Sequence, residues 1–88
     1  MTRTEAVEVL RAYGSDAEAG GRAAKEDWKT GRWPLFRATD FAALIGDALG
    51  PARGRAWEEG YRRMIDALCV VDAEKARRDL ERAAAAGI

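Results

Sequence analysis

Large apolar side chains are scarce in this sequence, and their scarcity limits what the chain can fold into. Leu, Ile, Val and Phe together occupy 15 of the 88 positions, whereas alanine alone occupies 19. Alanine buries little apolar area, so the three tryptophans must supply a large share of the core. Balanced charge, 15 basic against 15 acidic residues, keeps the composition outside the disordered class. We expect one small helical domain, residues 1–88, whose thin core self-association would reinforce.

The zero formal charge and the cysteine usage bear on partners and location. Sequence-independent binding to nucleic acid or to an anionic membrane needs excess Lys and Arg on one face, and zero net charge argues against it. Cys69 is the lone cysteine and lies in the apolar run 68–71, which indicates a buried thiol in a reducing compartment. We find no signal-peptide core and no membrane-spanning run, so we expect a cytoplasmic protein without membrane contact. The Ala- and Arg-rich, Lys-poor usage is typical of a small bacterial or phage protein.

A capping signal and a glycine stop predict a first helix over about residues 3–13. Thr2 and Glu5 have the spacing of a capping box, and Gly14 is a natural left-handed terminator. The apolar residues between them recur at helical spacing on one face, and they are Ala6, Val7, Leu10 and Tyr13.

A second capping signal at 15–18 predicts a helix that ends at Gly31. Gly20 and Gly21 interrupt it, at a cost of about 1 kcal/mol each relative to alanine. Two interpretations follow. Either the helix begins near Arg22, or small residues form a seam against which another helix packs closely. The seam would consist of Gly14, Ala17, Gly21 and Ala24.

Residues 31–39 are predicted to be a loop, because Pro34 favours extended backbone at the preceding residue. A third helix follows over about 40–49, capped by Asp40 or Thr39 and ended by the Gly-Pro pair at 50–51. Its apolar residues form one stripe that we expect to be fully packed, and they are Phe41, Leu44, Ile45, Ala48 and Leu49.

A fourth helix begins near Ala52, and Asp72 could cap a separate fifth helix over about 73–86. The apolar face of the fourth helix consists of Trp57, Tyr61, Met64, Ile65 and Leu68. A continuous seam also allows one long, bent helix, and it consists of Ile65, Cys69, Ala73, Ala76, Leu80 and Ala83. The alanine-rich end would suit an antiparallel or dimer contact. The predicted fold is therefore all-α, a compact bundle of four or five helices, with a long bent C-terminal helix as the variant.

The sequence offers little for catalysis or metal binding. It contains no histidine, which excludes the serine triad, cysteine–histidine pairs and two-histidine zinc sites. Glu58 and Glu59 each precede an arginine by four residues, the spacing of exposed ion pairs. The segment 50–54 lacks the Lys-Ser/Thr and the preceding strand of a phosphate-binding loop. We therefore expect no enzyme activity, no cofactor and no metal site.

The third and fourth helices could also form a helix-turn-helix, with Gly50 in the turn and Ala56 as the buried small residue. The acidic residues Glu58, Glu59 and Asp66 lie along the would-be recognition helix, where they would repel DNA.

Arginines without a helical partner mark the candidate binding site. Most charges pair at i, i+4, but Arg32, Arg37 and Arg53 have no obvious partner. Arg55 joins Arg53 at a helix start, where the helix dipole disfavours positive charge. Trp33 lies beside these arginines in the proline-stiffened loop, and Trp and Arg dominate interface hot spots. The predicted partner-binding residues are Arg32, Trp33, Arg37, Arg53 and Arg55. The alternative is that Trp33, Leu35 and Phe36 form the lid of a thin core. Both interpretations hold together if Phe36 points inward, and Trp33 and the arginines outward.

Three segments resemble marks of the ribosome modulation factor family. They are 19–24, Ala-Gly-Gly-Arg-Ala-Ala; 34–36, Pro-Leu-Phe; and 56–62, Ala-Trp-Glu-Glu-Gly-Tyr-Arg. The resemblance covers fewer than half of the residues, and its intervals and the neutral charge depart from that small, strongly basic family. It implies an RNA- or ribosome-associated role, in which arginine and aromatic side chains contact phosphate and stack on bases.

These observations predict a small non-catalytic helical binding protein that acts through protein–protein contact, as a regulator or an inhibitor, with a homodimer as its expected state. The alternative is a nucleic-acid-binding regulator, either helix-turn-helix-like or RNA/ribosome-associated, that uses the same arginines.

Overall fold

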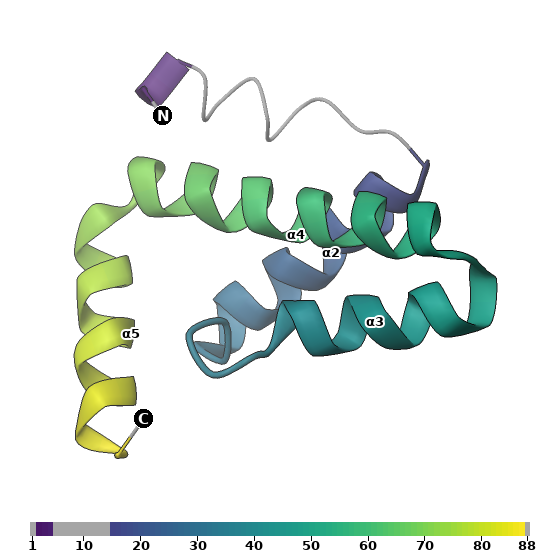
Figure 1. Ribbon diagram of the computed structural model, residues 1–88. Helices are drawn as coiled ribbons and strands as arrows, with labels where there is room; N and C mark the ends of the chain where they lie inside the picture. Colours follow the sequence, from purple (N-terminus) through teal and green to yellow (C-terminus); the bar gives the residue numbers. More distant parts are fainter. Residues whose placement is uncertain (1, 5–14, 88) are drawn as a thin grey trace.

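The computed structural model is an all-α bundle, as predicted, and it describes residues 2–4 and 15–87 (Figure 1). In those residues the helices are α2 (Ser15–Thr30), α3 (Ala38–Leu49), α4 (Pro51–Val71) and α5 (Ala73–Ala85), with no strand. Residues 3 and 4 are helical, and the rest of the predicted helix over 3–13 lies outside the described residues. None of the described helices has the length and apolar character that crossing a membrane requires.

The α2 helix contains the two adjacent glycines without a break. It begins at Ser15, so the alternative start near Arg22 is wrong. It ends at Thr30, and Gly31 has a φ of 75°, in the left-handed region that ends many helices. Both the start and the stop of α2 therefore agree with the capping signal and the predicted glycine terminator.

The last two helices are separate, and Asp72 marks the break. This residue leaves helical geometry, with φ of −133° and ψ of 72°, and its side chain accepts a 3.1 Å hydrogen bond from the Lys75 amide. Such a bond satisfies one of the free amides at a helix start. The single bent helix is therefore wrong, and α5 turns sharply away from the end of α4 (Figure 1).

The core lies where α2 crosses α4 and where α3 runs antiparallel beside α4 (Figure 1). Trp57 and Tyr61 are stacked with ring centroids 5.5 Å apart, and Phe36 lies 5.0 Å from Tyr61. The expectations that Trp57 belongs to the core and that Phe36 points inward are confirmed. The buried cluster consists of Ala24, Ala38, Ala42, Trp57, Tyr61 and Met64.

Glycines bring the helix backbones into close contact. A Cβ on Gly20 would lie 2.0 Å from the Trp57 carbonyl oxygen, and one on Gly60 would lie 2.0 Å from the Ala17 carbonyl oxygen. A real Cβ does not approach backbone atoms this closely, so α2 and α4 adopt this crossing only with glycine at both positions. Of the predicted seam, Ala17 contacts Gly60 and both Gly21 and Ala24 are buried, whereas Gly14 lies outside the described residues. The glycine at the closest contact is Gly20, which the seam did not include.

The stripe on α3 is not fully packed, contrary to the prediction. Leu44 is 64% exposed, Leu49 55% and Phe41 42%, whereas the buried positions of α3 are Ala38 and Ala42. The reason is again a close approach, because a Cβ on Gly54 of α4 would lie 2.4 Å from the Ala42 carbonyl oxygen. At that separation only small side chains fit between the helices, so several of the larger ones project into solvent.

The start of α3 also differs from the prediction of an Asp40 or Thr39 cap. The helix begins at Ala38, and Arg37 occupies the cap position without a side-chain hydrogen bond to the first turn. The Thr39 hydroxyl instead accepts a 2.6 Å hydrogen bond from Arg62 of α4.

Replacing Gly20 by alanine tests the close crossing. We expect Gly20→Ala to lower the free energy of unfolding by about 2–3 kcal/mol, because its methyl group would collide with backbone atoms that cannot rotate away. The matched control is Gly46→Ala in α3, where the new Cβ would meet only Pro51 at 3.5 Å. That variant should gain about 0.5–1 kcal/mol from improved helix propensity. Urea unfolding followed by circular dichroism measures the free energy of unfolding of both variants. Equal changes in the two variants would contradict the close backbone contact at Gly20.

Candidate functional site

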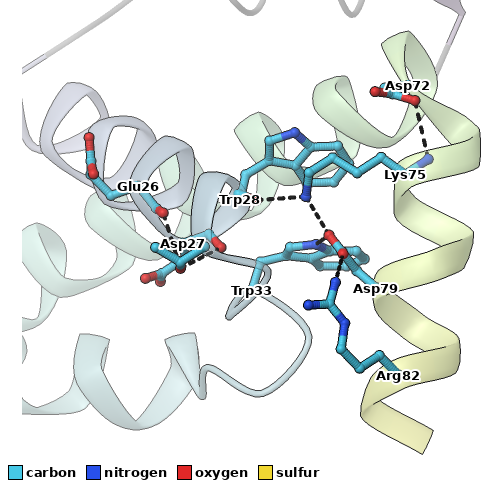
Figure 2. Close-up of polar contacts among 9 residues, drawn as sticks. Glu26, Asp27, Trp28, Trp33, Asp72, Lys75, Asp79 and Arg82 are labelled. Atoms are coloured by element: carbon cyan, nitrogen blue, oxygen red, sulfur yellow. Dashed lines mark hydrogen bonds and ion pairs between the residues drawn. The ribbon is translucent and has the colours of Figure 1, made fainter.

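A buried carboxylate fastens α5 to the rest of the bundle. Asp79 is 3% exposed and accepts a 2.8 Å hydrogen bond from the Trp33 indole nitrogen. It also accepts hydrogen bonds from Lys75 and Arg82 on its own helix (Figure 2). We call Trp28, Trp33, Lys75, Asp79 and Arg82 the α5 staple. Because direct packing of α5 on the other helices is slight, these polar contacts are its main attachment.

Lys75 connects the staple to the end of α2. Its Nζ donates a 2.7 Å hydrogen bond to the Trp28 carbonyl oxygen and lies 4.2 Å from the centroid of the Trp28 ring. The carbonyl belongs to the last turn of α2, where a cation is favoured by the helix dipole, and the ring adds a cation–π contact. Lys75 therefore contacts the last turn of α2, the carboxylate of Asp79 and the face of the Trp28 ring at the same time.

The same contacts draw Trp33 inward, which agrees with the alternative that it belongs to the lid of the core and not with the outward orientation. Its ring lies 5.4 Å from the ring of Trp28, and its only polar atom is bonded to Asp79. The prediction of an outward orientation failed because the partner is 46 residues away in the sequence, beyond any local pattern.

The charge environment of Asp79 favours its ionised form. Burial alone would raise its pKa, but hydrogen bonds from Lys75 and Trp33, together with the charges of Lys75 and Arg82, outweigh burial and hold the pKa below its ordinary value of 3.8. The staple is consequently complete at neutral pH.

A second buried carboxylate orders the loop from 31 to 37. Asp27 accepts a 2.7 Å hydrogen bond from the Tyr61 hydroxyl, and its carbonyl oxygen accepts a 2.8 Å bond from the Arg32 amide. Burial and the bond to Asp27 raise the pKa of Tyr61, so its hydroxyl stays a donor. The loop is thereby held against both α2 and α4.

The three arginines predicted to lack partners all form ion pairs, so that expectation is wrong. Arg32 lies 3.6 Å from Asp27 and Arg37 lies 2.8 Å from Asp40. Arg53 donates hydrogen bonds of 3.0–3.3 Å from Nε and Nη2 to the carboxylate of Asp16, and these bonds hold the pKa of Asp16 below its usual value.

The structure separates the five predicted residues into two groups. Arg32, Trp33 and Arg37 lie together on the loop between α2 and α3, whereas Arg53 and Arg55 lie at the start of α4. Arg53 precedes Arg62, the α4 residue that donates a hydrogen bond to Thr39 at the start of α3, by nine positions, or about 14 Å along the helix. Arg55 forms no ion pair with the described residues, and Glu59, four residues after it, pairs with Arg63 at 3.0 Å.

Trp33 and Arg37 of the loop group line a groove of about 560 Å³ between the loop, the start of α3 and α4, whereas Arg32 does not. We call this the loop–α4 groove. Its walls include Phe36, Tyr61 and Ile65. Two arginines, Arg37 and Arg62, and two aspartates, Asp40 and Asp66, also line it. Sequence reasoning missed Arg62, because its i, i+4 pairing with Glu58 marked it as ordinary surface.

A smaller pocket of about 300 Å³ lies between the end of α2 and α5. Four cationic side chains line it, against the single carboxylate of Asp79, and they are Lys29, Lys75, Arg78 and Arg82. We call this the basic pocket. Because it has four cations and one carboxylate, this pocket has the largest local excess of positive charge among the pockets described here. Arg78 forms no ion pair with the described residues.

The Cys69 thiol and the acidic side chains are the remaining groups to consider for reactivity and metal binding. Burial, together with Asp66 and Asp79, raises the pKa of the Cys69 thiol, which disfavours the reactive thiolate. Within residues 2–4 and 15–87 no three acidic or cysteine side chains converge as metal ligands would. The site therefore offers apolar contact and charged hydrogen-bond donors.

No known protein family, curated protein or solved structure matches this chain.

Replacing Asp79 by asparagine tests the α5 staple. At neutral pH we expect Asp79→Asn to lower the free energy of unfolding by about 2–3 kcal/mol, because three donors lose a charged acceptor. The carboxylate pKa is lower in the folded state, so its contribution is present above 3.8 and lost as the pH falls through the folded value. The difference in the free energy of unfolding between wild type and variant should therefore become smaller in acid. Urea unfolding at a series of pH values measures this difference.

The matched control is Asp66→Asn, an exposed aspartate on α4. Its effect should stay below about 0.5 kcal/mol. An equal loss in both variants, or a gap for Asp79→Asn that widens in acid, would contradict the role of the staple.

Proposed function

We propose that this chain is a small non-catalytic helical binding protein that regulates or inhibits another protein by contact, and that it forms a homodimer. The observation that carries the proposal is the loop–α4 groove, where Arg37, Arg62, Asp40 and Asp66 surround an apolar floor. This combination of an anchor pocket and charged donors is typical of protein interfaces.

The groove selects the chemistry of the partner. Its floor of Phe36, Tyr61 and Ile65 accommodates one apolar side chain. The side chains of Arg37 and Arg62 are 82% and 59% exposed, and their ion pairs with Asp40 and Glu58 lie at the surface, so both can exchange these partners for an incoming carboxylate. We therefore propose that the groove takes a protein segment that presents an apolar side chain next to Asp or Glu.

The predicted residues contribute unequally to this surface. Arg37 lines the groove with an exposed side chain that pairs with Asp40, and Trp33 lines it from a position fixed by Asp79. Arg32 lies on the same loop outside the groove, 64% exposed and paired with Asp27. Arg53 and Arg55 lie outside the groove and would take part only in a partner long enough to follow α4. Trp33→Ala is a poor probe of binding, since it also breaks the α5 staple.

Arg62 and Arg63 provide a matched pair for testing the groove. Both are exposed, and each pairs with a glutamate four residues earlier, but only Arg62 lines the groove. The two variants to compare are Arg62→Glu and Arg63→Glu. We expect Arg62→Glu to weaken partner binding at least about tenfold, because it repels the acidic segment and removes a donor. Arg63→Glu should bind like wild type.

The measurement is affinity purification from the native cell, followed by titration of the purified partner against each variant. Equal binding by Arg62→Glu and Arg63→Glu would overturn the proposed groove contact, whichever partner is recovered.

A nucleic-acid-binding regulator is the second candidate, favoured by the basic pocket with its unpaired Arg78. The antiparallel α3 and α4 differ from the roughly perpendicular pair of a helix-turn-helix, so the RNA- or ribosome-associated form is the one to test.

For this candidate, RNA affinity should fall steeply with salt. Arg78→Ala should reduce the salt slope by about one, since one phosphate contact is lost. Arg77→Ala is the control, because Arg77 is exposed on the same helix but engaged by Glu74 and Glu81. Absence of binding at low salt would remove this candidate.

A cytoplasmic location belongs to the same proposal. The raised pKa of the lone Cys69 keeps the thiol protonated and slow to oxidise, which suits a reducing compartment.

A further inference from the structure

The α3 helix carries three of the five large exposed apolar side chains of the described residues, Phe41, Leu44 and Leu49. Phe41, Leu44 and the exposed Ala48 share one face, whereas Leu49 lies about 140° around the helix from Leu44. The Phe41 ring also lies 4.8 Å from the Trp57 ring, and Phe41 remains 42% exposed. We call Phe41, Leu44 and Ala48 the α3 outer face. Monomeric proteins seldom leave several large apolar side chains together in water unless the surface has a partner.

Charges at the two ends of this face differ. Between Ala38 and Leu49 the only charged residues are Asp40 and Asp47, and Arg37 stands directly before the helix. Arg37 pairs with Asp40 at 2.8 Å, but its side chain is 82% exposed and has further donors for a second carboxylate. Asp47 is exposed and forms no ion pair with the described residues. The helix therefore presents an exposed ion pair at its start and an unpaired carboxylate near its end.

We propose that the α3 outer face is covered by α3 of a second copy, packed antiparallel about a twofold axis. In an antiparallel pair, facing residues have a constant sum of residue numbers. The register that sets Phe41 against Leu44 of the second copy sets Arg37 against residue 48 of the second copy. Asp47 of the second copy is therefore only one residue away from Arg37 in register, an offset of about 1.5 Å along the helix axis. One register thus satisfies the apolar and the charged contacts, and the twofold axis makes each of them twice.

The same charges disfavour the parallel arrangement. Parallel helices would place Arg37 beside Arg37 and Asp47 beside Asp47, and would align the two helix dipoles in the same direction. The zero formal charge of the chain adds no overall repulsion between copies. The sequence pointed to the alanine-rich end of α5 as an antiparallel or dimer contact. Ala83 there is buried within the chain, and the exposed alanines 84–86 offer little apolar area next to Leu44 and Phe41.

The size of the face sets the strength of the association. A standard interface covers about 800 Å² per partner, and the twelve residues of α3 span only about 18 Å. The contact is therefore small, and we expect a reversible dimer with a dissociation constant in the micromolar range rather than an obligate one. This inference rests on the proposed contact function and names one of its partners, the chain itself.

Sedimentation equilibrium of the full chain over a range from about 1 µM to about 1 mM tests the dimer. We expect Leu44→Asp to weaken association at least about tenfold, because it places a charge in the apolar contact. Leu80→Asp is the control, since Leu80 is a similarly exposed leucine on α5. Circular dichroism confirms that each variant is folded.

A charge exchange tests the register. Arg37→Asp and Asp47→Arg should each weaken the dimer several-fold, and the double variant should recover most of the wild-type affinity because the pairs are restored with opposite sign. A wild-type monomer throughout, equal effects of Leu44→Asp and Leu80→Asp, or a double variant weaker than both singles would overturn the proposal. Partner binding by Arg62→Glu and Arg63→Glu is scored separately, so loss of the dimer does not count against the groove, nor the reverse.

Discussion

The close contact between the backbones of α2 and α4 is the constraint on which the rest of the structure depends. Glycines at Gly20 and Gly60 let each helix approach a carbonyl of the other, and Gly54 repeats the device between α4 and α3. A chain with few large apolar residues fills its interior by bringing helices together rather than by adding side-chain volume. The aromatic stack of Phe36, Trp57 and Tyr61 then occupies the space that the crossing leaves.

This arrangement has a cost at the periphery. Where α3 meets α4 through alanine and glycine, several larger side chains of α3 cannot enter the contact. Leu44 is exposed for the same reason that Ala38 and Ala42 are buried, and Phe41 reaches the Trp57 ring, 4.8 Å away, while remaining 42% exposed. The pattern of spacing predicted the stripe on α3 but could not predict which side of it faces α4, because that depends on how near the neighbouring helix comes. A close approach selects the small-residue side of a helix.

Local signals predicted most of the fold and little of the site. The stop at Gly31, the cap at Asp72 and the ion pair between Lys75 and Asp79 depend on residues within a few positions, and all three are present. The bond from Trp33 to Asp79 and the pair of Arg53 with Asp16 join residues 46 and 37 positions apart. Contacts of that kind follow from the packing of helices, which no single segment encodes, so the five predicted residues were recognised as unusual but their partners were not.

The two attachments of the bundle differ in kind, and this difference bears on how the molecule can act. The contact of α2 with α4 is apolar and close, whereas α5 depends on one buried carboxylate and the donors around it. Trp33 belongs to that staple and also lines the loop–α4 groove, and Lys75 and Arg82 belong to it and also line the basic pocket. A ligand in either recess therefore meets side chains that hold α5 in place. A ligand that binds more tightly when α5 is docked would stabilise the staple, and it would thereby also stabilise the other recess. The size of this effect equals the difference between the ligand's binding free energies to the docked and the undocked forms.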